Sequence, residues 1–162
     1  MEIDTQRVIE LVKSVRPLFM DPERASRITV KGAADFVTQV DFQVQERMRS
    51  GLFDMYPQVQ FMGEEKDNRD IDFSGAVWIL DPVDGTTNLI HDFRCSALSL
   101  ALCDRGQLEL GIIYQPYRDE LFLAQRGRGA FLNGSPIHVS SVSDLGQSLI
   151  SIGTSPYNHD LA

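Results

Sequence analysis

The sequence predicts an α+β fold, with two N-terminal helices packed on a mostly antiparallel sheet of about six strands. Three observations predict this fold. Apolar residues recur with the 3.6-residue period of a helix over much of the first 57 residues. From residue 59 onward the period changes to two, and short apolar runs follow one another. The connections between these runs are tight, as in hairpins, which favours antiparallel pairing.

The helices are predicted from apolar stripes and from the residues that end them. The first is expected over residues 3–19, with its buried face made by Val8, Val12, Val15, Leu18 and Phe19. Pro17 and then Asp21-Pro22 end it. The second has a longer stripe, made by Val40, Val44, Met48, Leu52 and Met55, and Pro57 closes it. Residues 28–40, between the two helices, are expected to form a short hairpin.

The strands are predicted from apolar runs separated by turn residues. The runs are QFMG, AVWIL, SALSLALC, LELGIIY, ELFLAQ and SLISIG. The pair Asn133-Gly134 suits a type I′ turn between two strands. No repeat, low-complexity tract or linker marks a second domain within residues 1–162.

Composition and charge exclude several classes of function. A chain with 43% hydrophobic and 23% charged residues is ordinary for a globular protein, and a net charge of -8 argues against a nucleic-acid partner. No apolar run reaches the roughly 20 residues that span a bilayer, and acidic residues stand where a signal peptide would be basic. We therefore expect a cytoplasmic protein without a membrane partner. Cys95 and Cys103, eight residues apart in an expected strand, lie too far apart to form a disulfide.

Acidic residues gather near the ends of predicted strands and helices. They form three pairs, Asp35 with Asp41, Glu64 with Glu65, and Asp81 with Asp84. If the fold brings these carboxylates together, they cannot all stay ionised without a positive partner. Few lysines or arginines stand near them, and oxygen-rich sites suit hard divalent cations. The sequence therefore predicts a magnesium site.

Each pair also has a simpler interpretation. Thr38 to Asp41 fits a capping box, so Asp41 can hold a helix start with or without a catalytic role. Glu64 and Glu65 can form a solvated turn after a strand. Asp84 and the two residues after it can form a turn or a helix cap.

The stretch WILDPVDGTTN, residues 78–88, is the most informative. A buried run delivers Asp81 to a strand end, and Asp84 with the flexible Gly85 follows, so carboxylates and free backbone N–H groups stand side by side. An EF-hand loop is excluded because its third and fifth positions would be Val83 and Gly85. A P-loop is excluded because no Gly-Lys-Ser/Thr is present. The two-residue aspartate spacing of haloacid-dehalogenase-like phosphatases is also absent, because Pro82 stands two residues before Asp84.

Taken together, these motifs resemble the inositol monophosphatase family of magnesium-dependent, lithium-sensitive phosphomonoesterases. The matching stretches, in the family's order, are DFVTQVD at 35–41, GEE at 63–65, WILDPVDGTTN at 78–88 and GRGAFLNG at 127–134. The resemblance implies the N-terminal half of the sugar phosphatase fold and a small-molecule phosphate ester as substrate. We also expect a homodimer.

The resemblance implies a set of metal ligands. Glu64, Asp81 and the backbone carbonyl of Val83 would bind a first magnesium. Asp81 would bridge to a second magnesium, which would also take Asp84. Lys31 would lie beside the site in a mobile loop.

The resemblance also implies residues for phosphate binding and catalysis. Asp84, Gly85 and Thr86 would contact the substrate phosphate, the last two through backbone N–H groups. The Thr86 hydroxyl, hydrogen-bonded to Asp41, would help to orient a metal-bound water that attacks phosphorus in line. Glu65 would support this water or a further magnesium.

The sequence departs from the family at Leu89, where an aromatic is usual, at Phe93-Arg94, where Phe-Pro is usual, and in a motif of the family's second half. Family members carry a later Trp-Asp-x-Ala-Ala-Gly motif whose aspartate completes the second metal site, whereas Trp78 is the single tryptophan of this sequence. We therefore expect residues 1–162 to be the N-terminal metal-binding domain of an inositol monophosphatase-like protein, with the C-terminal domain absent and little activity alone. The alternative is a non-catalytic metal-binding or dimerisation module derived from the family.

Overall fold

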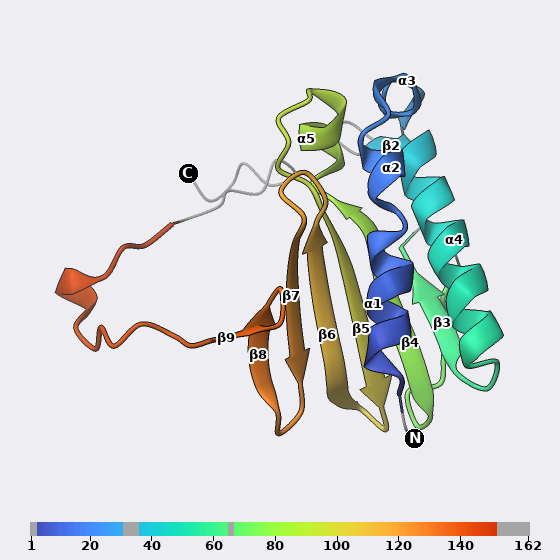
Figure 1. Ribbon diagram of the computed structural model, residues 1–162. Helices are drawn as coiled ribbons and strands as arrows, with labels where there is room; N and C mark the ends of the chain where they lie inside the picture. The colour runs from blue at the N-terminus through green and yellow to red at the C-terminus, as the bar shows by residue number, and fades with distance from the viewer. Residues whose placement is uncertain (1–2, 31–35, 65–66, 152–162) are drawn as a thin grey trace.

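Helices cover one face of a mostly antiparallel sheet in the computed structural model, which describes residues 3–30, 36–64 and 67–151 (Figure 1). The helices are α1 (Thr5–Lys13), α2 (Arg16–Phe19), α3 (Pro22–Ala25), α4 (Gln39–Met55) and α5 (Thr86–Ile90), with a 3-10 turn at Leu145–Gln147. The strands are β1 (Ile28–Val30), β2 (Phe36–Thr38), β3 (Gln60–Gly63), β4 (Ala76–Asp84), β5 (Ala97–Asp104), β6 (Gln107–Gln115), β7 (Glu120–Gln125), β8 (Gly129–Leu132) and β9 (Ser135–Ile137). The predicted α+β class is confirmed.

The main sheet keeps its strands in chain order. Its seven strands run β3-β4-β5-β6-β7-β8-β9, and β1 and β2 form a separate antiparallel hairpin between α3 and α4, as predicted. All neighbours in the main sheet are antiparallel except β3 and β4, which are parallel. A parallel pair ends its two strands at the same edge of the sheet, and the segments after β3 and β4 therefore meet there.

The predicted helix over residues 3–19 is divided in two. The first part, α1, ends at Lys13, and α2 begins at Arg16. Pro17 has no N–H to donate to the carbonyl of Lys13, so one continuous helix would lose a hydrogen bond there. In α2 the same proline lies in the first turn, where its missing N–H costs nothing. Ser14, at the break, donates its hydroxyl to the carbonyl of Leu11 at 2.6 Å.

The second predicted helix is confirmed as α4, and its apolar stripe is buried. Val40, Val44, Met48 and Leu52 are at most 1% exposed. They pack with residues of α1 and α2 against the sheet in one continuous core. Figure 1 shows α1 and α4 lying along the same face of the sheet.

The sheet has more strands than predicted, and one predicted strand is not formed. The extra strands are β8 and β9, joined by the predicted turn, in which Asn133 and Gly134 both have positive φ (47° and 82°). The run SLISIG, over residues 148–153, was expected to be a strand, but its described residues 148–151 form none. Leu149 there is 101% exposed, so no neighbouring strand or core covers it.

The alternation of side chains leaves two unlike faces on the sheet. Ile112 and Tyr114 of β6 are buried against the helices, whereas Ile113 between them is 51% exposed on the opposite face. In the register of the sheet, Ile113 pairs with Ser99 on one side and with Phe122, itself 36% exposed, on the other. The face opposite the helices is therefore partly apolar.

Both cysteines are free. Cys103 is buried in β5, while Cys95 is exposed and precedes the strand. The expectation that they do not form a disulfide is confirmed, although they do not share one strand. No helix among the described residues has the length and hydropathy to cross a bilayer.

We predict that Met48→Ala lowers the free energy of unfolding by about 2–5 kcal/mol, because the lost side chain leaves a cavity between α4 and the sheet. Urea denaturation followed by circular dichroism measures this. Ser50→Ala, at an exposed position of the same helix, is the control and should change stability by less than about 0.5 kcal/mol. Equal effects of the two substitutions would show that this face of α4 is not buried in solution.

Candidate functional site

The end of β4 carries a bulge that brings two aspartates to one edge of the sheet. Asp81 pairs with Ser99 and Asp84 pairs with Ala97, so the three-residue step on β4 is opposed by a two-residue step on β5. One extra residue is therefore inserted between the two aspartates. Pro82, which cannot donate a ladder hydrogen bond, lies in this interval. The bulge ends regular pairing and presents both carboxylates near the strand end.

Glu64 comes to the same edge from the neighbouring parallel strand. Gly63, the last residue of β3, pairs with Leu80, and the Glu64 N–H donates to the Leu80 carbonyl at 3.2 Å. Asn68 holds Gly63, the residue before Glu64, in place. Its side-chain amide donates to the Gly63 carbonyl at 2.7 Å, and its side-chain oxygen accepts the Gly63 N–H at 3.3 Å. Because Gly63 lies beside Leu80 in this parallel pair, the next residue, Glu64, lies beside Asp81.

The most buried of the three carboxylates has a raised pKa. Asp81 is half-buried, and its pKa is raised to about 7. Burial is the largest cause, followed by the charge of Glu64, a hydrogen bond between these two side chains, and the charge of Asp84. The Val83 N–H, which donates to Asp81 Oδ1 at 3.1 Å, acts in the opposite direction. Within the described part of the chain, none of these three acids forms an ion pair.

Asp41 is both a helix cap and a partner of the site. Its Oδ2 accepts the Thr38 backbone N–H at 2.8 Å and the Thr38 hydroxyl at 2.6 Å, which completes the predicted capping box of α4. Its Oδ1 lies 3.1 Å from the hydroxyl oxygen of Thr86, which donates to it. Asp41 is 2% exposed, so a buried carboxylate spans from the start of α4 to the start of α5.

Thr86 has a choice of acceptors. Its hydroxyl oxygen also lies 3.0 Å from the Val83 carbonyl, and a single hydroxyl proton can be donated fully to only one of the two. In either case the hydroxyl oxygen can still accept a hydrogen bond from a donor such as water. The peptide before Thr86 is set by Gly85, whose φ of 88° is in the left-handed region that glycine adopts without strain.

Most of the predicted site residues therefore meet at one edge of the sheet. Glu64, Asp81, Val83, Asp84, Gly85 and Thr86 lie at the ends of β3 and β4, and Asp41 joins them through its hydrogen bond with Thr86. Three other residues considered from the sequence, Lys31, Asp35 and Glu65, lie outside the described residues. Sequence patterns missed Asn68 and Ser96, which hold the backbone of the site and whose partners lie in other segments.

The donors at this edge suit a hard cation that keeps part of its water shell, and they do not form a closed cage of protein ligands. In residues 3–30, 36–64 and 67–151, no three acidic, histidine or cysteine side chains already converge on one centre. Magnesium does not require such convergence, because it keeps several waters and takes only one or two carboxylates from the protein. All donors here are oxygens, and besides burial the charges of Glu64 and Asp84 raise the pKa of Asp81. The residues present therefore fit a magnesium ion.

The comparisons with known proteins agree with the fold. The family model described as "Inositol monophosphatase family" matches residues 2–161. The inositol monophosphatase of Dictyostelium discoideum is 40% identical over 150 residues, which cover 90% of this chain and 55% of that protein. The solved structure of the extragenic suppressor protein suhB from Bartonella henselae has a TM-score of 0.77 and 32% identity, covering 85% of this chain and 54% of that one.

A third relative has a ligand-bound structure. This IMPase/NADP phosphatase, complexed with Mg²⁺ and phosphate, has a TM-score of 0.73 and 30% identity, over 82% of this chain and 51% of that one. The α+β fold with its acidic sheet edge thus has the architecture of a phosphatase family, and the chain belongs to the inositol monophosphatase family. The chain spans about half the length of the curated relatives that it matches.

We predict that Asp81 titrates near pH 7 in the metal-free protein and that Glu64→Gln lowers this pKa without restoring the ordinary value of 3.8, because burial remains. NMR titration of the side-chain carboxyl carbon measures it. Glu109→Gln, which removes an acid paired with Arg126 instead, is the control.

The raised pKa of Asp81 makes the stability of the metal-free protein depend on pH. The folded metal-free protein binds the Asp81 proton more tightly than the unfolded chain does. The stabilising contribution of Asp81 is therefore complete below its unfolded pKa and is lost as pH rises through about 7. An Asp81 pKa near 3.8 in the wild-type protein would contradict both statements.

Proposed function

We propose that this chain carries the metal and phosphate sites of a magnesium-dependent phosphomonoesterase that hydrolyses an inositol or sugar phosphate. The observation that carries this proposal is the acidic sheet edge, where the charges of Glu64 and Asp84 contribute to the raised pKa of Asp81. Two structural relatives support the ligand class. One is complexed with Mg²⁺ and phosphate, and a dual specific IMPase/NADP phosphatase is bound with D-inositol-1-phosphate.

The metal would be held by residues of the β3 and β4 ends. Glu64, Asp81 and the Val83 carbonyl would take one magnesium, and Asp81 with Asp84 would take a second. Magnesium, when bound, offsets the negative charge of the carboxylates and the phosphate and acidifies nearby water. We further propose that Glu65, which lies outside the described residues, assists the same chemistry.

The chain's own residues would position the phosphate and the attacking water. Gly85 and Thr86 would donate backbone N–H groups to the phosphate, beside the carboxylate of Asp84. With its proton donated to Asp41 and not to the Val83 carbonyl, the Thr86 hydroxyl would turn its lone pairs toward a proton donor. An attacking water that donates to Thr86 would thereby be oriented, and its proton would have an acceptor path through Thr86 to Asp41. No covalent intermediate with the protein is needed.

Residues 1–162 by themselves would hydrolyse the ester slowly. The matched relatives extend over nearly twice the length of this chain, and the resemblance assigns a further aspartate of the second metal site to a motif that these residues lack. We propose that this chain has the role of the N-terminal metal-binding domain.

A second candidate function, a non-catalytic metal-binding or dimerisation module, is favoured by one observation. Ile113 and Phe122 are exposed side by side on the sheet face opposite the helices, and an exposed apolar patch marks an interaction surface. We propose a homodimer in both cases. Sedimentation of the wild-type protein and of Ile113→Lys tests whether this sheet face forms the dimer. Phosphate release that Asp84→Asn abolishes separates the two candidates, because a non-catalytic module releases none.

We predict that the protein binds Mg²⁺ above pH 7, where Asp81 is ionised, and that Asp81→Asn lowers the affinity at least tenfold. Isothermal titration calorimetry measures this. Asp144→Asn, which changes an acid in an exposed 3-10 cap, should have no effect. Equal Mg²⁺ affinities of the wild-type and Asp81→Asn proteins would contradict the proposed metal site.

We predict that residues 1–162 with Mg²⁺ release phosphate from inositol monophosphate at less than about 1 s⁻¹, the lower end of ordinary enzyme turnover. A colorimetric phosphate assay measures this, and Asp84→Asn should abolish the remaining activity. Faster turnover that Asp84→Asn abolishes would support the phosphatase and overturn the assignment of this chain as a nearly inactive domain. Turnover unaffected by Asp84→Asn would overturn the site.

A further inference from the structure

The Gly85–Thr86 peptide is held from the side of its carbonyl. The Gly85 carbonyl oxygen accepts the Leu89 N–H at 3.1 Å within α5 and also the Ser96 hydroxyl at 2.9 Å. A peptide unit is planar and trans, so its N–H points away from its C=O. Fixing the Gly85 carbonyl therefore fixes the direction in which the Thr86 N–H points.

The hydrogen bond from Ser96 matters because Gly85 does not restrain its own backbone. Glycine reaches left-handed and right-handed conformations at similar cost, and the φ of 88° at Gly85 needs contacts to hold it. Asn88 closes the same loop, since its side-chain amide donates to the Cys95 carbonyl at 2.9 Å. A Cβ on Gly85 would lie 3.1 Å from both of these groups, so the segment before β5 passes directly over Gly85.

Ser96 is itself held firmly. It is 2% exposed, and the next residue, Ala97, pairs with Asp84 in the sheet. Its hydroxyl also contacts the phenol of Tyr117, whose pKa is raised by burial and lowered in part by this hydrogen bond. Tyr117 thus lies against the Ser96 hydroxyl.

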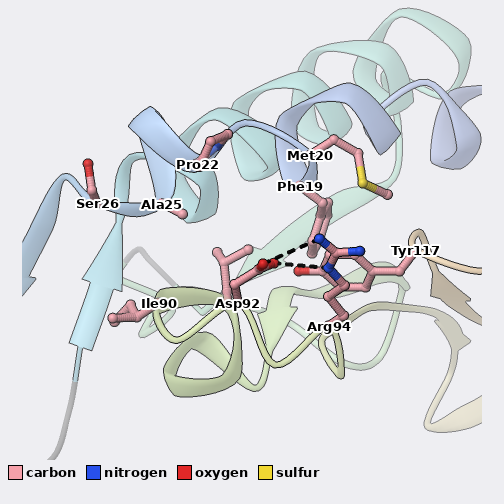
Figure 2. A pocket seen from close by; sticks show the side chains of 10 residues that line it. Phe19, Met20, Pro22, Ala25, Ser26, Ile90, Asp92, Arg94 and Tyr117 are labelled. Carbon is pink, nitrogen blue, oxygen red and sulfur yellow. Dashed lines mark hydrogen bonds and ion pairs between the residues drawn. The ribbon is translucent and has the colours of Figure 1, made fainter.

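Tyr117 connects Ser96 to the helical layer. Its ring packs edge-on against Phe19 of α2, with ring centroids 6.4 Å apart and an interplanar angle of 85°. Figure 2 shows both rings among the side chains that line a pocket of about 300 Å³, with the Asp92–Arg94 ion pair nearby. Phe19 is 3% exposed, so the contact rests on a buried core residue.

We propose that Ser96 is a positioning residue that orients the Gly85–Thr86 peptide and thereby sets the affinity of the site for phosphate. The inference rests on the proposed function, because it takes these N–H groups as phosphate ligands. Among the described residues, no hydrogen bond joins Ser96 to Glu64, Asp81 or Asp84, so its role is separable from metal binding.

The test measures binding of inorganic phosphate to the 162-residue protein at saturating Mg²⁺, by calorimetry and by the amide shift of Thr86 in NMR spectra. Ser96→Ala should weaken phosphate binding roughly three- to tenfold, as expected for one lost hydrogen bond, while Mg²⁺ affinity stays within about twofold. Ser14→Ala is the matched control, because it also removes a hydroxyl that donates to a backbone carbonyl, but in the N-terminal helices. It should leave phosphate affinity unchanged.

A second variant keeps the test decisive if Ser96→Ala does not fold. Ser96→Cys retains the size of the side chain with a much weaker donor and should weaken phosphate binding by a similar factor. Wild-type affinity in the folded Ala or Cys variant would overturn the role of Ser96 alone. If the wild-type protein binds Mg²⁺ but no phosphate, or neither ligand, the phosphate site of the proposed function fails and the role of Ser96 fails with it.

Discussion

The buried carboxylate of Asp41 joins the helical layer to the functional edge of the sheet. One of its oxygens holds the start of α4 through Thr38, and the other accepts the hydroxyl of Thr86 at the start of α5. A buried carboxylate is stable only when its lone pairs are satisfied, and here groups from two separate elements satisfy them. The position of α5 relative to α4 therefore depends on this one side chain.

At the acidic edge of the sheet, by contrast, the carboxylates repel one another. Parallel pairing of β3 with β4 places Glu64 beside Asp81, and the bulge in β4 adds Asp84. Burial and this repulsion together raise the pKa of Asp81 to about 7, which favours its protonated form in the metal-free protein. A divalent cation would replace that proton with a larger charge. The same geometry that destabilises the metal-free site thus favours a metal.

The backbone of the site is held by hydrogen bonds from residues outside the motif itself. Gly85 supplies a conformation that other residues rarely adopt, but the hydrogen bond from Ser96 and the closure of the loop by Asn88 hold it there. Ser96 in turn rests on Tyr117 and the core beneath α2. Phosphate recognition at this edge would therefore depend on packing between the first helices and the loop before β5.

Several features follow from the sequence by itself because they depend on neighbours in the chain. The apolar stripe of α4, the capping box at Thr38 and Asp41, and the type I′ turn at Asn133-Gly134 are all local patterns, and the structure contains each of them. The break after Lys13 was missed although Pro17 marks it, because the apolar spacing continues across the break. The strand expected at residues 148–151 is not formed, because an apolar run becomes a strand only when a partner edge pairs with it.

Only the tertiary structure decided which distant residues touch. The hydrogen bond between Thr86 and Asp41 spans 45 residues, and no periodicity announces it, although the family resemblance implied it. The raised pKa of Asp81 needs both its burial and the approach of Glu64 from another strand, and neither can be read from spacing. Ser96 acts on Gly85 across a loop through a single hydroxyl, which has no sequence signature. Residue types and their order thus determined which chemistry was available, whereas strand pairing and burial decided where that chemistry is concentrated.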